Sequence, residues 1–566
     1  MIRLLVCLLA ALAGLSGPAR AEAPGADIAL GMNLAGVNDW TAEQPFIDVM
    51  KTARRWIGHK PGQWGGVSFD ALQSRGLLDG SGWPRKIPAD LASIGTLILT
   101  DLPAGGAAYA GRYVLRFEGE GLVEVGGAAT DKRYGDGRVA FDFTPGPGRM
   151  VLIKIQRTDP RGTGDHVRNI TVVKKENEAA WQRGELFNPA WLRTLDGVEA
   201  VRFMDWMKTN DSTQERWADR PRVDDFSYVR RGVPAEIMIA LANRLDVDPW
   251  FTMPHLGQEA YFRGFARLVA ERLDPARKVY VEYSNEVWNW QFDQAEWAEA
   301  RAKERWGEDH RWMEYYGLRA AQVAQIWTRV FAERRDRLVN VISTQTGWLG
   351  LEKQALEAPH WVAEDPARNA PPFEAFDAYA VTGYFGHSLG TDKRRDLVRG
   401  WIEKSRQSAE EAARARGLSG AENEAYVARH QFDAATQWAA QELWDGTVTG
   451  TREGSLADLL ARILPHHASV AKRYGLDLVA YEGGSHVVGI GAQVDDAAMT
   501  EFFIALNYSP EMGRLYERLI EGWADLGGGL LALYADVAAP TKWGSWGHLR
   551  HLDDDNPRWR AVERFK

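Results

Sequence analysis

The stretch Lys278–Gln291, KVYVEYSNEVWNWQ, decides the fold of this chain. Residues 279–283 are β-branched or aromatic and predict a β-strand. The strand pattern ends in Ser-Asn-Glu at 284–286, and an aromatic segment follows before a long helical pattern begins. A strand that ends in Asn-Glu beside two tryptophans is unusual for a purely structural element. The chemistry available to Glu286 is therefore the main question.

Similar strands recur along the chain, with helical patterns between them. They are expected to start at Ile28, Val198, Pro249, Val279, Leu338, Phe376, Asp477 and Gly529. Eight strand–helix units indicate a (β/α)₈ TIM barrel, in which functional residues follow the carboxyl ends of the strands. A doubly wound open sheet also alternates strands and helices. The barrel is favoured because the count is eight and no Gly-rich phosphate fingerprint follows an early strand.

Two regions interrupt this alternation. Between residues 59 and 176, short strands separated by Gly- and Pro-rich turns predict an inserted antiparallel β-sandwich, which could bind carbohydrate or merely shape a cleft. The expected strands are Thr96–Thr100, Tyr113–Phe117, Leu122–Val125, Val139–Phe143, Met150–Ile155 and Asn169–Val173. The barrel would then comprise residues 22–58, including a helix over Phe46–Trp56, and residues 177–566. A helical insertion rich in Ala, Glu and Arg is expected at 390–455.

The N-terminus resembles a secretory signal peptide over residues 1–21. Arg3 is followed by an apolar run, and Ala19-Arg20-Ala21 matches a small-x-small cleavage site. The only cysteine, Cys7, lies inside this segment, so the mature chain would lack disulfides and thiolate metal sites. No later segment has enough consecutive apolar residues to predict a membrane span. A secreted or periplasmic location is expected.

Composition narrows the classes of partner. The formal net charge is −9 and no run of Lys or Arg compensates locally, so no nucleic acid partner is expected. The 24 tryptophans are the compositional outlier. Many will belong to the core, but several lie next to Asn, Asp or Gly, as in Trp543-Gly544-Ser545-Trp546, which suits a wall on which sugars stack. A polysaccharide or oligosaccharide partner is therefore favoured.

Two glutamates follow strands of the predicted barrel, Glu286 after the fourth and Glu482 after the seventh. Either one alone could form a salt bridge or cap a helix. Together at one barrel mouth they supply what glycoside hydrolysis requires, because one carboxyl group must be protonated to assist the leaving group while the other is ionised.

The Asn285-Glu286 pair and Glu482 resemble clan A of the glycoside hydrolases, the retaining (β/α)₈ enzymes. The resemblance implies that Glu286 is the general acid/base, that Glu482 is the nucleophile, and that Asn285 binds the sugar 2-hydroxyl. It also implies substrate-binding roles at other strand ends, for Arg202, His255, Tyr384 and a tryptophan after strand eight, either Trp543 or Trp546, with Trp543 favoured. Each has a structural alternative: Arg202 could pair with a buried Asp, while His255 and Tyr384 could belong to the core. The resemblance covers the barrel and not the inserted sandwich.

Other chemistries have no motif behind them. The sequence contains no HExxH, CxxC, GxSxG or P-loop pattern, so neither a metal nor a cofactor is expected. His466 and His467 are adjacent on a helix, where their side chains diverge by about 100° and make a poor metal clamp.

The favoured function is thus a retaining glycosidase with a preference for endo cleavage, whose two carboxyl groups should lie about 5–5.5 Å apart. The alternative is a non-catalytic glycan-binding protein that assists exopolysaccharide export or assembly. The sequence gives neither the sugar, the linkage nor the oligomeric state.

Overall fold

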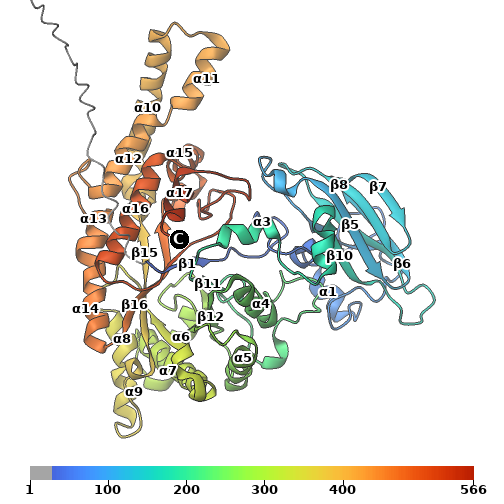
Figure 1. Cartoon of the computed structure of the whole chain (residues 1–566), viewed down its shortest axis with the longest axis horizontal. Helices are drawn as coiled ribbons and strands as arrows, with labels where there is room; N and C mark the ends of the chain where they lie inside the picture. Colours follow the sequence, from blue (N-terminus) through green and yellow to red (C-terminus); the bar gives the residue numbers. More distant parts are fainter. Residues whose placement is uncertain (1–27) are drawn as a thin grey trace, which may run out of the picture.

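In the computed structural model, which describes residues 28–566, eight parallel strands close into a barrel (Figure 1). They are β1 (Leu30–Asn33), β11 (Ala200–Arg202), β12 (Asp248–Met253), β13 (Val279–Tyr283), β14 (Leu338–Ser343), β15 (Ala378–Phe385), β16 (Asp477–Ser485) and β17 (Leu531–Leu533). Each strand pairs with the next in chain order, and β17 pairs with β1, where Leu531 lies opposite Leu30. Every expected strand start lies within two residues of an observed one. The predicted barrel is confirmed.

Both faces of the barrel strands are buried. The interior is filled by a cluster that includes Trp250 and Tyr481 together with small residues such as Ala200 and Ala378. The outer face packs against the helices in a much larger cluster. Strands buried on both sides give nearly continuous apolar runs, as β15 (AYAVTGYF) illustrates, and this is why the sequence pattern was strong enough to count them.

Helices surround the barrel and follow most of its strands (Figure 1). They are α4 (Ala235–Leu245), α5 (Glu259–Arg272), α6 (Asp293–Trp306), α7 (Trp312–Val330), α8 (Glu352–Glu357), α9 (Pro359–Glu364), α13 (Leu456–Asp458), α14 (Leu464–Tyr474), α15 (Ala497–Asn507), α16 (Pro510–Asp525) and α17 (Pro557–Glu563). Between β15 and β16 the chain forms α10 (Arg395–Ala415), α11 (Gly420–His430) and α12 (Asp433–Asp445). The α10–α11 hairpin projects away from the barrel in Figure 1.

Two antiparallel sheets lie between β1 and β11 in the chain. One has the order β10-β5-β8-β7 and the other β3-β2-β4-β9-β6. Their strands are β2 (Ile57–His59), β3 (Gly66–Val67), β4 (Ser93–Ile98), β5 (Gly111–Glu118), β6 (Gly121–Gly127), β7 (Thr130–Gly135), β8 (Arg138–Phe143), β9 (Val151–Thr158) and β10 (Arg168–Lys174), with α1 (Phe69–Ser74) after β3 and α2 (Glu178–Gln182) and α3 (Pro189–Leu192) leading back to the barrel. One apolar cluster contains Leu115 and Phe141 from the first sheet and Ile94 and Ile153 from the second. The insertion is therefore a β-sandwich with its own core.

The helix expected over Phe46–Trp56 is wrong. Only a single 3₁₀ turn forms, at Val49–Thr52, and Ile57 already begins β2. The apolar residues at helical spacing serve two cores instead of one helix face, because Phe46 packs in the barrel cluster whereas Met50 and Trp56 pack in the sandwich cluster.

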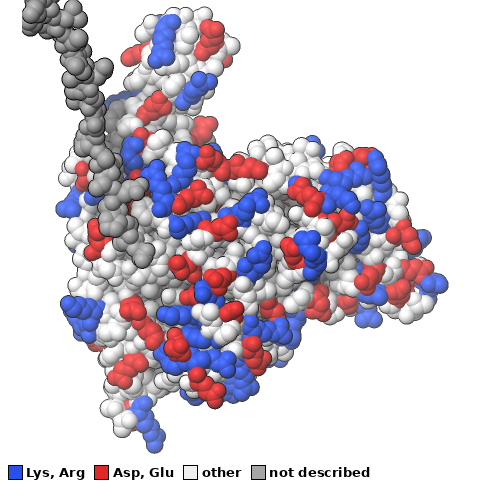
Figure 2. Space-filling view, viewed as in Figure 1, with Lys and Arg blue, Asp and Glu red and all other residues white. Residues whose placement is uncertain are grey.

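The predicted signal peptide and Cys7 lie outside the described residues. Among residues 28–566, no helix has the length and apolar character needed to cross a bilayer. Positive and negative side chains are interspersed over the face shown in Figure 2.

The loop between β11 and α4 joins the barrel to the sandwich. Phe226, on this loop, is 3% exposed and belongs to the sandwich cluster. Its ring packs on Trp56 and stacks on Phe69 at centroid distances of 5.5 and 6.3 Å. A barrel loop is thus anchored in the core of the inserted domain.

We expect Phe226→Ala to destabilise the protein by about 3–5 kcal/mol, because the substitution leaves a cavity where the two domains meet. Val223→Ala on the same loop is a matched control, since Val223 is 46% exposed and its truncation should change stability by less than about 0.5 kcal/mol. Urea denaturation of both variants measures the difference. Equal stabilities would show that Phe226 does not join the domains energetically.

Candidate functional site

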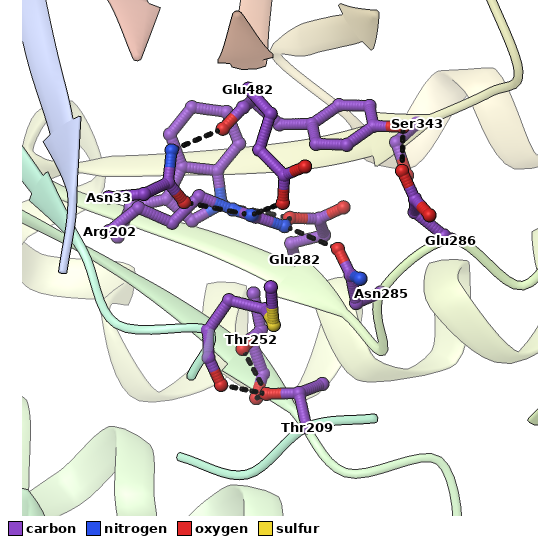
Figure 3. A network of polar contacts seen from close by, with 12 residues as sticks. Asn33, Arg202, Thr209, Thr252, Glu282, Asn285, Glu286, Ser343 and Glu482 are labelled. Atoms are coloured by element: carbon purple, nitrogen blue, oxygen red, sulfur yellow. Dashed lines mark hydrogen bonds and ion pairs between the residues drawn. The ribbon is translucent and has the colours of Figure 1, made fainter. Parts of the chain in front are cut away.

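Arg202, the last residue of β11, lies at the centre of a polar network in the barrel mouth (Figure 3). One terminal nitrogen, Nη1, donates to Glu482 Oε1 at 2.8 Å and to Asn33 Oδ1 at 3.1 Å. The other, Nη2, donates to Glu282 Oε2 at 2.9 Å and to Asn285 Oδ1 at 2.8 Å. The side chain is fully buried. A single guanidinium therefore connects four strands of the barrel.

Glu482 receives hydrogen bonds on both carboxyl oxygens. Arg202 occupies Oε1, and the Tyr384 hydroxyl donates to Oε2 at 3.0 Å. Tyr384 comes from β15, the strand that pairs with β16, and its register partner is Gly484, two residues beyond Glu482. Arg202 and Tyr384, both predicted from sequence as site residues, thus contact Glu482, the predicted nucleophile.

Glu286 is presented by a tight turn directly after β13. Ser284 and Glu286 both have left-handed backbones, with φ of 61° and 41°, which is uncommon for residues with a Cβ and is typical of constrained functional loops. The carboxylate accepts from Asn289 Nδ2 at 2.9 Å and from the Tyr481 hydroxyl at 3.1 Å. Unlike Glu482, it has only neutral donors.

The two glutamates have different electrostatic environments although both are buried. Burial raises the pKa of Glu482 to about 8; the charge of Arg202 opposes this rise, and Glu286 adds to it. Burial likewise raises the pKa of Glu286, against the hydrogen bonds from Asn289 and Tyr481. Each carboxyl group ionises more easily while the other stays protonated, because two nearby anions repel each other. The guanidinium beside Glu482 favours the anion there, whereas no cation hydrogen-bonds Glu286.

Asn285 is linked to Glu482 through Arg202 and is held from several sides. Its Oδ1 accepts from Arg202, and its Nδ2 donates to Asn210 Oδ1 at 3.0 Å. Gln294, at the start of α6, donates to the backbone oxygen of Asn285 and to Asn210, both at 2.8 Å. These contacts fix the position of the amide before any ligand arrives.

His255 follows β12 and is 3% exposed. Its ring packs edge-on against Trp297 at 5.5 Å, and within residues 28–566 its Nδ1 has no hydrogen-bond partner. Burial lowers the pKa of His255 to about 4, so the imidazole is neutral at pH 7. The structure thus places His255 at the barrel mouth without a hydrogen bond from its ring to either glutamate.

After strand eight, Trp543 and Trp546 occupy very different positions. Trp543 is 64% exposed. The ammonium group of Lys542 lies 4.9 Å from the centre of its ring. Trp546 instead lies on Tyr384 at 6.0 Å and on Tyr534 at 5.8 Å. Of the two candidates, Trp546 rather than the favoured Trp543 is linked to Glu482, through Tyr384.

The residues near Arg202 that were not predicted from sequence include Asn33, Asp205, Glu282 and Tyr534. Glu282 forms a fully buried ion pair with Arg202, so the buried acid paired with Arg202 is a second glutamate and not an Asp. In the sequence, Glu282 could have been noticed as a charged residue within an otherwise apolar strand. Tyr534 directly follows β17 and donates to Asp205 Oδ2 at 2.8 Å. Burial raises the pKa of Asp205.

A groove lined with tryptophan adjoins Glu286. It has a volume of about 690 Å³ and is lined by Trp288, Asn289, Trp290, Gln345 and Trp348, among others. Trp290 and Trp348 are 47% and 53% exposed. Exposed indole faces beside the carboxyl group can stack on sugar rings. Asn289 links this groove to Glu286 directly.

Glu352, His466 and His467 form a cluster of potential metal ligands on the outer side of the barrel strands. The Nδ1 of His467 contacts the Tyr379 hydroxyl at 2.7 Å, and its Nε2 contacts the Thr346 carbonyl at 2.8 Å. Since an imidazole engaged at both nitrogens has no lone pair left for a metal, these contacts describe a structural network.

No family model matches the sequence, and no curated protein matches it. Two similar solved structures are a mannanase and a virulence factor in complex with a substrate analogue. The hyperthermostable endo-1,4-β-D-mannanase from Thermotoga petrophila RKU-1, with maltose and glycerol, is 10% identical, with a TM-score of 0.24 over 66% of this chain and 93% of that chain. Virulence factor SghA, in complex with its substrate analogue salicin, is 11% identical, with a TM-score of 0.29 over 68% of this chain and 85% of that chain. These similarities concern the fold alone. The closed parallel barrel, established by its own strand pairing, fits a clan A (β/α)₈ glycoside hydrolase.

Proposed function

We propose that this protein is an exported retaining glycoside hydrolase that cleaves O-glycosidic bonds of a polysaccharide or oligosaccharide. The observation that carries the proposal is the asymmetry of the two glutamates. Glu482 is bound by the Arg202 guanidinium, whereas Glu286 receives hydrogen bonds only from neutral groups. One carboxylate is thereby prepared as an anion and the other as an acid, which is the division of roles that the reaction requires.

In the first step, the Glu482 carboxylate attacks the anomeric carbon while the bond to the leaving oxygen breaks. Glu286 transfers its proton to that oxygen, and a covalent glycosyl ester forms on Glu482. In the second step, Glu286, now ionised, removes a proton from water as the water attacks the anomeric carbon, and Glu482 leaves as a carboxylate. Arg202 stabilises Glu482 as an anion before the attack and after release. Asn285, held by Arg202 and Asn210, is placed to bind the sugar 2-hydroxyl.

The tryptophan groove favours a chain-like substrate. Glu286 protonates the departing part of the substrate, so a groove that adjoins Glu286 would hold that departing part. Its exposed indoles extend the contact surface beyond a single sugar unit. This supports endo action on a glycan chain over cleavage of a small glycoside.

Glu286→Gln and Glu482→Gln should each lower kcat by at least about 10²–10⁴-fold while glycan binding persists, because each keeps its shape but loses an essential proton donor or nucleophile. Product release from a panel of bacterial and plant polysaccharides gives the rates, and NMR of the first-formed anomer reports the stereochemistry. Glu410→Gln, on the projecting α10, is the control. Inversion of configuration would contradict double displacement. Binding without turnover by the unaltered protein would favour the glycan-binding alternative.

Tyr481→Phe should shift the alkaline limb of the pH profile of kcat/KM to higher pH. The hydrogen bond from Tyr481 lowers the pKa of Glu286, so its removal lets that pKa rise, and the acid stays protonated further into the alkaline range. The ring of Phe retains the contact with the Arg202 guanidinium, which lies 5.1 Å from the Tyr481 centroid. Tyr134→Phe, in the sandwich, serves as the control. A downward shift of the alkaline limb would refute the acid assignment of Glu286.

Trp290→Ala and Trp348→Ala should raise KM for long oligosaccharides roughly three- to tenfold, in line with about 0.5–1.5 kcal/mol per lost aromatic contact. Hydrolysis of an activated glycoside with a small leaving group should be almost unchanged, because that leaving group does not reach the groove. Initial rates on a series of chain lengths test this difference. An equal effect on long and short substrates would exclude the groove as a binding surface for the chain.

A further inference from the structure

A second groove leaves the barrel mouth between the barrel and the sandwich. It has a volume of about 710 Å³. Its inner end contains Asp205 and Asn210, of which Asn210 accepts a hydrogen bond from Asn285. From there it runs past the loop that follows β11 to α1 of the inserted domain, where Gln73 lines it. The groove is therefore continuous with the candidate catalytic site and is built jointly by both domains.

Four cationic side chains line this groove: Arg55, Lys208, Arg230 and Arg231. Among residues 28–566, none of them forms an ion pair. Arg230 makes only a long contact of 3.4 Å with Gln73 Oε1 and lies 5.2 Å from the ring of Phe69.

The cations affect one another through space. Burial lowers the pKa of Lys208, and the charge of Arg55 lowers it further. Burial also lowers the pKa of Arg230, and both Arg231 and Arg55 add to this effect. The charge of Asp205 opposes the effect on Lys208, and Asp225 and Asp70 oppose the effect on Arg230, yet the pKa of both cations stays lowered. Cations held close together without ion-pair partners raise the free energy of the protein. Binding of an anion would lower it again.

The acidic residues of the groove lower its net charge but form no ion pairs with this cluster within residues 28–566. They are Asp70, Asp205, Asp211 and Asp219. Asp219 instead pairs at 2.9 Å with Arg216, which does not line the groove. Asp211 accepts the backbone N–H of Asp293, and Asp205 accepts the Tyr534 hydroxyl. The four cations therefore have acidic groups in their surroundings but no direct carboxylate partner.

We propose that this groove binds acidic groups of the glycan, so that the substrate of the candidate catalytic site is an anionic polysaccharide. Guanidinium groups suit this role because they bind carboxylate and sulfate groups through paired hydrogen bonds. A neutral chain would leave the four cations without ion-pair partners, which makes the groove selective as well as attractive. This assignment of the substrate class rests on the proposed function.

The test measures binding and turnover separately. Calorimetric titration of Glu286→Gln, in low and high salt, uses uronate oligosaccharides, sulfated oligosaccharides, and the carboxyl-reduced and desulfated forms of each. The unaltered protein is assayed for hydrolysis of the same panel. The variants are Lys208→Gln alone and the double substitution Arg55→Gln with Arg230→Gln, each in the Glu286→Gln background. Arg406→Gln, on the distant α10, is the control for removal of a surface charge.

We expect acidic oligosaccharides to bind at least tenfold more tightly than their neutralised forms, and added salt to reduce this difference. Each lost cation should weaken acidic binding by roughly three- to tenfold and leave neutral binding unchanged. Whether uronate or sulfate gives the tighter binding identifies the acidic group. Equal binding of acidic and neutralised glycans, or hydrolysis confined to neutral ones, would overturn the inference and leave the glycosidase proposal standing. Selective acidic binding without hydrolysis would support the inference and refute the glycosidase proposal.

Discussion

The buried guanidinium of Arg202 is the interaction on which the rest of the barrel mouth depends. It brings together side chains from the ends of β1, β13 and β16 and from the turn after β13. A buried arginine would be prohibitively costly without partners, and removing one partner of such a pair typically costs about 3–5 kcal/mol. The folded barrel therefore holds the glutamates and Asn285 at fixed positions. Stability and preorganisation of the site come from the same contacts.

Charge counting around Arg202 explains why two buried glutamates can differ. Glu282 and Glu482 both pair with the guanidinium, so its single positive charge is already shared by two carboxyl groups. A third carboxylate nearby, on Glu286, has no cation of its own among its hydrogen-bond partners. The proposed mechanism therefore has the proton on Glu286. Glu286 is the proposed acid less because of its own contacts than because Arg202 pairs with two other residues.

The fold could be predicted from sequence because its strongest signal is repeated. Strands such as β15 and β16 are buried on both faces and give apolar runs that no other element imitates. Where a pattern served two cores, as over Phe46–Trp56, the prediction of a helix failed. The edge strand β7 (TDKRYG) was missed because every one of its residues is exposed and Tyr134 alone does not make an alternating apolar pattern.

Residues of the site could be predicted from sequence only where they lie near the ends of predicted strands. Glu286, Glu482, Arg202 and Tyr384 each lie within three residues of the carboxyl end of a barrel strand. A barrel brings such residues together whatever the conformations of its loops. The loop after β17 obeys no such rule, so the choice between Trp543 and Trp546 depended on how the chain folds back. The residue directly after β17 is Tyr534, which precedes both tryptophans.

The inserted sandwich has a physical consequence for the catalytic barrel. Its position between β1 and β11 replaces the first helix of a regular barrel and brings α1 alongside the loop that carries Lys208. A barrel alone would expose that loop to water, where charges are screened. A second domain on the other side encloses the cations, lowers the effective dielectric and lengthens the range over which they act. The insertion thus turns a surface loop into one wall of a groove. In the proposed function, the charge of that groove, rather than its shape, discriminates between glycans.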